Sequence, residues 1–138
     1  MTDVPDVTPA QALDAVMSDP DAELVDVRTV AELMFVGAPD LSAAGKRLHT
    51  VEWQRFPAME VNPDFIGALR GAGLGPEKKL YFICRSGVRS LAAGRAAVAA
   101  GQAAAFNVGG GFEGPADAAG HRGTSAGWKA SGLPWKQP

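Results

Sequence analysis

Short apolar runs alternate with segments of helical periodicity along this chain, and this alternation constrains the fold more than any other feature of the sequence. The runs Glu23–Val27, Lys79–Ile83 and Ala103–Val108 have the length and content of buried strands. Short connections with intervening helices build βαβ units, whose strands are parallel and covered by helices. The sequence therefore predicts an α/β fold with a central parallel β-sheet of about five strands and helices on both faces.

Caps and breakers mark the helix boundaries along the chain. The tetrapeptide Thr-Pro-Ala-Gln at residues 8–11 is typical of a helix start, because threonine can cap the first turn and glutamine can reach back to the cap. Periodicity and glycine stops predict further helices at Thr29–Phe35, from Asn62 to Gly71, and at Ser90–Ala100. A weaker strand is expected at Val51–Trp53.

The sequence assigns no chemical role to the aromatic residues or the histidines, since neither histidine lies near Cys84 along the chain. The tail is predicted to form a last short helix and a covering strip, which contain Trp128 and Trp135. His49 and His121 are expected to be surface or second-layer residues and not general bases. The other large aromatic residues are expected to pack in the core or against the surface, namely Trp53, Phe56, Phe106 and Phe112.

Length and charge restrict the classes of function. With 138 residues, of which 46% are apolar, residues 1–138 are expected to form one domain. A net charge of −2 and a pI near 5.6 argue against nucleic-acid binding. The acidic beginning lacks the pattern of a signal peptide, and no apolar stretch is long enough to span a membrane. We therefore expect a cytoplasmic protein without a nucleic-acid or membrane partner.

Cys84 is the only cysteine of the chain. It cannot form an intramolecular disulfide, and no Cys and His residues at zinc-binding spacing surround it, so neither a metal nor a cofactor is predicted. It directly follows the strand Lys79–Ile83, and ligands of open parallel sheets bind at the carboxyl ends of strands. The sequence therefore places this thiol at the edge where a binding site is expected.

The residues after Cys84 suit an anion-binding loop. Gly87 permits a tight curve into the next helix, and a loop of this shape turns successive backbone N–H groups inward. Such a nest at a helix N-terminus favours the thiolate over the thiol, which leaves Arg85 and Arg89 for a second anion, the substrate. A lone cysteine at a strand end is often a small buried hydrophobe. The polar and charged residues that follow this one favour a functional role.

Three motifs resemble those of the rhodanese family of sulfurtransferases. Residues Cys84–Ser90 read Cys-Arg-Ser-Gly-Val-Arg-Ser, which is similar to the family's Cys-Arg-x-Gly-x-Arg/Thr/Ser loop between a strand and a helix. Asp26, Arg28 and Glu32 match a second signature. The stretch Asn107–Phe112, followed by Gly127-Trp128 and Gly132-Leu133-Pro134, matches a third. The resemblance spans nearly the whole chain and implies a single rhodanese-like domain.

The resemblance also implies a mechanism of sulfur transfer. Cys84 would attack the outer sulfur of thiosulfate, expel sulfite and hold the sulfur as a persulfide until cyanide, a thiol or an acceptor protein removes it. Arg85 occupies a position that is basic in thiosulfate-using relatives and usually glycine in mercaptopyruvate-using ones, which favours thiosulfate. The loop residues would bind the substrate, namely Arg85, Ser86, Gly87, Val88, Arg89 and Ser90.

The remaining motif residues are assigned structural roles, and one stretch departs from the family. Arg28 and Glu32 are expected to form a scaffold salt bridge, whereas Arg89 would steer the dianion and stabilise the leaving sulfite. Residues 37–40 read Gly-Ala-Pro-Asp where many members have Gly-His-Ile-Pro-Gly-Ala. The adjoining segment Asp40–Arg47 is longer than usual and could cover the site or contact a partner.

Two enzymatic rivals fit less well, and one rival role stays open. A cysteine-based phosphatase or arsenate reductase needs a Cys-x5-Arg loop, but Ser90 stands where that arginine belongs. The run Gly109–Gly114 has the form G-x-G-x-x-G, yet Pro115 follows at once and too few residues remain for a dinucleotide-binding unit. An intact cysteine loop does not distinguish a free enzyme from a sulfur relay or docking module fed by a partner protein.

Overall fold

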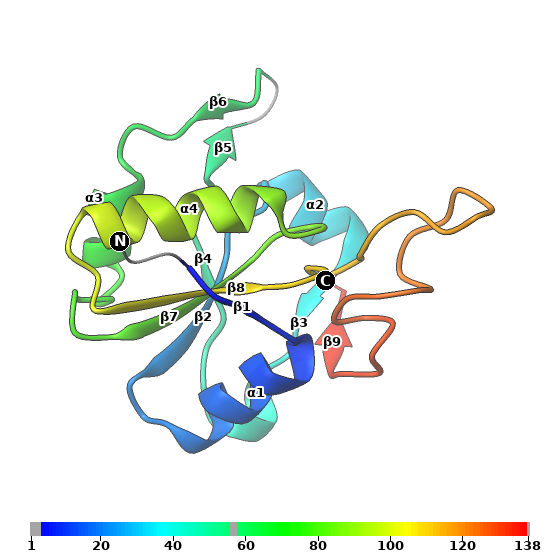
Figure 1. The fold of residues 1–138 in the computed structure, drawn as a ribbon, viewed down its shortest axis with the longest axis horizontal. Helices are drawn as coiled ribbons and strands as arrows, with labels where there is room; N and C mark the ends of the chain where they lie inside the picture. The colour runs from blue at the N-terminus through cyan, green and yellow to red at the C-terminus, as the bar shows by residue number, and fades with distance from the viewer. Residues whose placement is uncertain (1–3, 56–57, 138) are drawn as a thin grey trace.

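A five-stranded parallel sheet forms the centre of the protein in a computed structural model that describes residues 4–55 and 58–137 (Figure 1). The strands follow the order β1-β8-β7-β2-β4, and every pairing between neighbours is parallel. This topology confirms the predicted α/β fold. The strands are β1 (Asp6–Val7), β2 (Ala22–Asp26), β4 (His49–Thr50), β7 (Lys79–Ile83) and β8 (Ala104–Val108).

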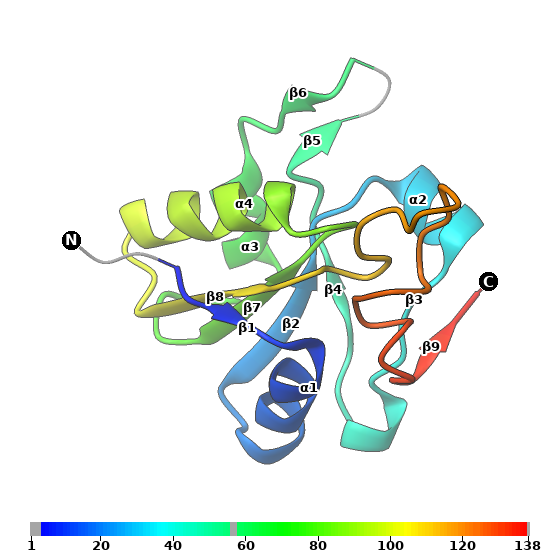
Figure 2. The same ribbon diagram turned by 45° about the vertical axis from the view of Figure 1, so that its right-hand side comes forward.

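Helices cover both faces of the sheet, as predicted. Two of them, α3 and α4, lie on one face, and α1 lies on the other (Figures 1 and 2). The bounds are α1 (Pro9–Ser18), α2 (Val30–Val36), α3 (Phe65–Gly71), α4 (Val88–Ala99) and the short 3-10 helix η1 (Ser42–Ala44).

Two small antiparallel pairs lie outside the central sheet. β3 (Ala38–Pro39) pairs with β9 (Trp135–Lys136) and ties the end of the chain to the segment after α2. β5 (Gln54–Arg55) pairs with β6 (Glu60–Val61) in a hairpin that projects beyond the carboxyl end of the sheet (Figure 2).

Local sequence signals explain why the elements begin and pack where they do. α1 starts with the expected capping box, in which the Thr8 hydroxyl accepts from the Gln11 amide and the Gln11 side chain accepts from the Thr8 amide. Along β7, Leu80 and Phe82 pack under α3 and α4, whereas Tyr81 and Ile83 pack in the cluster that holds α1. Alternate residues of this central strand therefore fill the two halves of the core.

Glycine in α4 is explained by close packing on the sheet. A Cβ atom at Gly94 would lie 3.0 Å from a methyl carbon of Val4 and 3.6 Å from the ring of Phe82. The helix therefore uses this glycine for close approach, as the sequence suggested, which offsets its poor intrinsic helix propensity.

Three predicted boundaries are shifted by two or three residues in the structure. The helix expected from Asn62 begins at Phe65, as α3. The strand expected at Val51–Trp53 is β4 at His49–Thr50, although the amides of Val51 and Trp53 still donate to backbone carbonyls next to β2. The helix expected from Ser90 begins two residues earlier, at Val88. Shifts of this size are expected at element ends, where local sequence signals are weakest.

The predicted last short helix is wrong. Residues 109–134 form turns and irregular segments without a helix, and they end in β9. Trp128 is fully buried there and donates its Nε1–H to the carbonyl of Pro134, at 2.7 Å. Side-chain burial therefore orders this tail, and Trp135 lies in β9 as part of a covering strip. Phe56 lies outside the described residues.

The segment Asp40–Arg47 does not line the pocket that contains Cys84. Lys46 near its end donates to the backbone carbonyls of Asp19 and Ala22, at the amino end of β2. Because the strands are parallel, this end of the sheet is opposite to the edge that Cys84 follows. The possible covering role of this segment is therefore wrong for the structure.

No helix within residues 4–55 and 58–137 has the length and apolar content of a membrane span.

Candidate functional site

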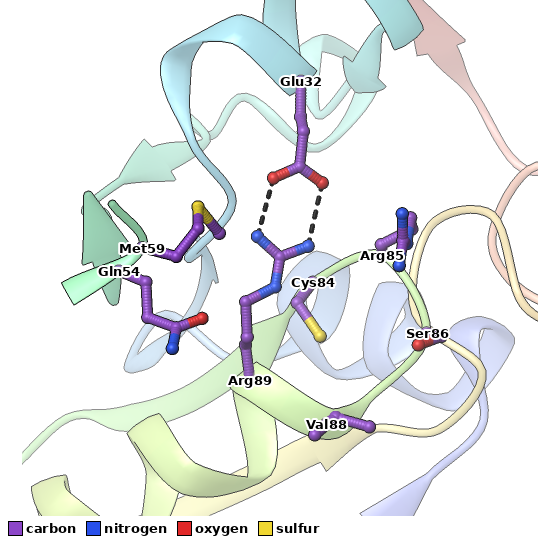
Figure 3. Close-up of a pocket in the computed structure, with 8 residues that line it drawn as sticks. All are labelled: Glu32, Gln54, Met59, Cys84, Arg85, Ser86, Val88 and Arg89. Carbon is purple, nitrogen blue, oxygen red and sulfur yellow. Dashed lines mark hydrogen bonds and ion pairs between the residues drawn. The ribbon is translucent and has the colours of Figure 1, made fainter. Parts of the chain in front are cut away.

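Cys84 lies at the carboxyl end of β7, at the start of a loop that curls into α4 (Figure 3). The residue is buried and belongs to the core cluster under α3 and α4. Its sulfur nevertheless has polar neighbours, since the Gly87 amide donates to Sγ at 3.1 Å and the Ser90 Oγ lies 3.2 Å from it. The thiol is therefore built into the polar loop and is not enclosed by aliphatic side chains alone.

The loop curls because Gly87 adopts a conformation that other residues avoid. Its φ angle is +109°, and it is the N-cap of α4. The first amides of a helix, here those of Val88, Arg89 and Ser90, have no intrahelical acceptor. The structure therefore has the glycine turn at a helix N-terminus that an anion-binding loop requires, while the binding of an anion there stays a prediction.

A second segment holds this loop from outside. The amide of Phe112 donates to the carbonyl of Cys84 at 2.8 Å, and the amides of Glu113 and Gly114 donate to the carbonyl of Arg85 at 3.0 and 3.1 Å. In a trans peptide the N–H points opposite to the C=O. These contacts therefore turn the amides of Arg85 and Ser86 away from the segment that follows β8. The glycine run after β8 thus supports the cysteine loop.

The sulfur lies beside a pocket of about 430 Å³. Three parts of the fold form its walls: α2, the β5–β6 hairpin and the cysteine loop with the start of α4 (Figure 3). Two of the predicted substrate-binding residues, Gly87 and Ser90, do not line this pocket. Ser90 is fully buried beneath it. The lining residues are Glu32, Gln54, Met59, Cys84, Arg85, Ser86, Val88 and Arg89.

Arg89 spans the pocket to Glu32 of α2. Its two terminal nitrogens donate to the two carboxylate oxygens at 2.6 and 2.8 Å (Figure 3). Burial raises the pKa of Glu32, but the hydrogen bonds and charge of Arg89, with bonds from Thr29, outweigh it and hold this pKa at about 2. Hydrogen bonds to Glu32 also raise the pKa of Arg89, against the effect of its burial. Both groups are therefore charged at neutral pH.

The predicted Arg28–Glu32 salt bridge is wrong. Arg28 instead forms a fully buried ion pair with Asp26, with its Nη2 2.7 Å from Oδ2. The physical reason is that α2 begins at Val30 with Thr29 as its cap, so Arg28 precedes the helix and is not an i,i+4 neighbour on its surface. Arg89 is consequently held by a carboxylate, and exposed Arg85 is the second cation of the pocket.

Sequence reasoning missed the residues that the hairpin contributes. Gln54 and Met59 line the pocket, although the hairpin strands are two residues long and carry no periodic pattern. Met59 has a φ of +55°, a conformation that is uncommon for residues with a side chain. Neither histidine lines the pocket: His49 lies 3.3 Å from a carboxylate oxygen of Glu23. No group of three metal-binding side chains occurs in the described part of the chain.

The Glu32–Arg89 pair predicts a pH dependence of stability. Because the pKa of Glu32 is lowered from 4.5 to about 2, the pair contributes fully above pH 4.5 and its contribution is lost as the pH falls through 2. In thermal unfolding between pH 2 and 7, Glu32→Gln should therefore be destabilised relative to wild type most strongly at neutral pH, and the difference should shrink below pH 4.5. Arg89→Gln should remove the same dependence. A difference that is constant from pH 7 to 2 would contradict the assigned pairing.

Two relatives cover almost the full length of the chain. A protein of Rickettsia rickettsii with uncharacterized function is 32% identical over 133 residues, which is 96% of this chain and 98% of the relative. The crystal structure of Rv0390 from M. tuberculosis has 44% identity and a TM-score of 0.89, and the match covers 99% of this chain and 100% of that one. No family model matches the chain.

Three further solved structures share the fold at lower identity. The polysulfide-sulfur transferase of Wolinella succinogenes has a TM-score of 0.65 and 22% identity, over 98% of this chain and 80% of that one. A rhodanese-like domain from Anabaena has a TM-score of 0.63 and 15% identity, over 100% and 81%. A possible tyrosine phosphatase from Rhodopseudomonas palustris has a TM-score of 0.59 and 21% identity, over 96% and 85%. These three likenesses concern the fold alone.

Proposed function

Because the chain belongs to the rhodanese-like family, we propose that it is a sulfurtransferase that carries sulfur on Cys84. The observation that carries this proposal is the position of Sγ, which accepts the Gly87 amide at 3.1 Å inside a loop that ends at a helix N-terminus. Such surroundings stabilise a sulfur anion. We infer a cytoplasmic setting, in which a single thiol stays reduced.

The small-molecule donor that we propose is thiosulfate. The Cys84 thiolate attacks the outer sulfur, the S–S bond of thiosulfate breaks, and sulfite leaves with the electron pair of that bond. The cysteine then carries a persulfide anion. An acceptor such as cyanide or a thiol attacks the terminal sulfur and returns Cys84 to the thiolate. Each step conserves the sulfane sulfur and needs no external oxidant or reductant.

The loop residues divide the binding roles among them. Arg85 is exposed at the pocket and attracts the dianionic donor, while Arg89, held by Glu32, supplies a fixed positive charge beside the leaving sulfite. The backbone amides of the loop donate hydrogen bonds to the persulfide anion, namely those of Arg85, Ser86, Gly87, Val88, Arg89 and Ser90. This assignment requires only backbone donors and two cations around the sulfur.

The short loop argues against a phosphatase. A phosphate-binding loop of the Cys-x5-Arg form needs an arginine six positions after the cysteine, where this chain has Ser90. Ser90 is buried and bonded to Asn107, so it presents no cation to the pocket. The arginine one position earlier, Arg89, is already paired with Glu32. A tetrahedral phosphate would therefore lack its bidentate partner.

A protein acceptor or donor is the second candidate, and exposed apolar residues favour it. The elements that line the pocket carry six of the eight large apolar side chains that are exposed among the described residues. Small ions do not need such surroundings, whereas partner proteins bury exposed apolar side chains. The six are Val30, Met34 and Phe35 of α2, Met59 and Val61 of the hairpin, and Val88 of α4.

Intact-mass measurement after thiosulfate treatment tests the proposed function. The wild-type chain is expected to gain one sulfur atom and to lose it again on addition of cyanide, because the persulfide forms on the nucleophile and is removed by a thiophile. The Cys84→Ser variant, which has no other cysteine, is expected to gain none. The absence of a gain in the wild type with thiosulfate, and with a persulfidated protein as donor, would refute the proposal.

Kinetic measurements distinguish the free enzyme from the relay. Steady turnover with thiosulfate and cyanide would support an enzyme of small molecules. Slow turnover with fast uptake of sulfur from a persulfidated protein would support a relay fed by a partner.

A further inference from the structure

A chain of side-chain hydrogen bonds runs from Cys84 to the far edge of the sheet. The Ser90 hydroxyl lies 3.2 Å from Sγ and 2.5 Å from the Oδ1 of Asn107 on β8. The Nδ2 of Asn107 donates to the Oδ1 of Asp6 on β1 at 2.9 Å and to the carbonyl of Gly87 at 3.2 Å. Ser90 and Asn107 are buried, and Asp6 is exposed. Neither Asp6 nor Asn107 lines the pocket beside the sulfur.

The partners of Asn107 determine which way its amide faces. An ionised carboxylate and a backbone carbonyl only accept hydrogen bonds, so both must face the NH₂ group of the amide. The oxygen of the amide is then left to face Ser90. Since a hydroxyl has one proton, Ser90 donates it to Asn107 and turns a lone pair towards the sulfur of Cys84.

A lone pair directed at sulfur discriminates between its states. It can accept the proton of a neutral thiol, but it repels a thiolate, which needs donors around it. The Gly87 amide acts in the opposite sense, because it donates to Sγ. In the persulfide the negative charge lies on the outer sulfur, and the inner sulfur carries no proton, so the repulsion is smaller. The free thiolate is thus the state that this arrangement disfavours most.

We propose that Asn107, anchored by Asp6, is a positioning residue that turns the Ser90 hydroxyl away from Cys84 and so holds back ionisation of the free thiol. The proposal rests on the proposed function only in taking Cys84 as the reacting group. In the sulfur-transfer cycle this arrangement raises the free energy of the free thiolate more than that of the persulfide, and it therefore favours loading of the cysteine. The charged groups of the pocket, which the test leaves in place, are Arg85, Arg89 and Glu32. The Asp26 carboxylate, whose charge acts on Arg89, is also unchanged.

The pH dependence of Cys84 alkylation by iodoacetamide tests this inference. In Asn107→Leu the Ser90 proton is free to turn towards the sulfur, so the midpoint of the alkylation profile should fall by about one pH unit or more, which is the effect of one hydrogen bond gained by a charged group. In an Ser90→Ala background the Asn107→Leu change should have no such effect, because Asn107 acts through the hydroxyl. Thermal unfolding monitors the fold of each variant.

Two outcomes would overturn the inference. One is an unchanged midpoint in folded Asn107→Leu, and the other is a shift of the same size with and without Ser90. If Asn107→Leu does not fold, the smaller truncation Asn107→Ala decides, since it too removes the amide oxygen that accepts the Ser90 proton. A shift in the same direction, absent in the Ser90→Ala background, supports the inference, and no shift contradicts it. Alkylation needs no sulfur donor, so its result is independent of whether thiosulfate loads the protein.

Discussion

The Arg28→Met variant is expected to lose about 3–5 kcal/mol of folding free energy, because it leaves the buried carboxylate of Asp26 without its cation. Both side chains are 0% exposed, and Nε and Nη2 of Arg28 donate to the carboxylate at 2.7 to 3.1 Å. Nη2 also donates to the carbonyl of Gly37 at 2.8 Å, and the guanidinium carbon lies 4.4 Å from the centre of the Phe112 ring. A loss of this size is a large share of the total stability of a domain, about 5–15 kcal/mol.

The test is urea unfolding of Arg28→Met beside two matched variants. Asp26→Leu/Arg28→Met removes both charges and should recover part of the loss, because no charge remains buried. Lys79→Met breaks an exposed ion pair with Asp19 and should have a much smaller effect. Equal effects of Arg28→Met and Lys79→Met would show that the buried pair does not carry this stability.

Nη1 of Arg28 is buried without a hydrogen-bond partner in the described part of the chain, and the Phe112 ring is the group that offsets this loss.

The Gly111→Ala variant is expected to lose about 2–5 kcal/mol and most of its sulfur transfer, since overpacking and a left-handed backbone add their costs. Gly111 has a φ of +62°, and a Cβ there would lie 2.5 Å from the carbonyl oxygen of Cys84 and 2.6 Å from the carbonyl carbon of Arg85. These are backbone atoms that cannot rotate away. The substitution would push the cysteine loop off the segment that orients its amides.

Gly45→Ala is the matched control for this prediction. Gly45 has a similar φ of +66°, but no atom lies within 4 Å of a Cβ built there. It should lose only the cost of the left-handed backbone, about 1–2 kcal/mol, and keep full persulfide formation. Urea unfolding measures the first quantity and intact mass after thiosulfate measures the second. If the two alanine variants behaved alike, contact between Gly111 and the loop would not matter.

The position of the candidate site could be predicted from the sequence because it depends on local order. Cys84 follows a strand, Gly87 makes the turn and the helix begins at Val88. Those three features lie within a few residues of one another, so short-range preferences fix them. The interpretation of the cysteine as the centre of a loop with inward amides stays a prediction; the structure gives one such amide, that of Gly87, which donates to Sγ.

The charge partners of the site could not be predicted in this way. Glu32 and Arg89 are separated by 57 positions, and only the packing of α2 above the start of α4 brings them together. Spacing along the chain favoured Arg28 as the partner of Glu32, yet the helix cap at Thr29 leaves Arg28 outside the helix. The same limit applies to Asn107 on β8, whose side-chain oxygen accepts the hydroxyl proton of Ser90 on α4, 17 positions away in the sequence.

The sequence by itself determined the alternation of elements, the parallel sheet and the edge at which the thiol lies, because periodicity, caps and glycine turns act between near neighbours. The tertiary structure alone decided which cation faces which carboxylate, which hairpin closes the pocket and which way the Ser90 hydroxyl turns. These pairings depend on distances between elements far apart in the chain, and such distances are set only when both halves of the core are packed.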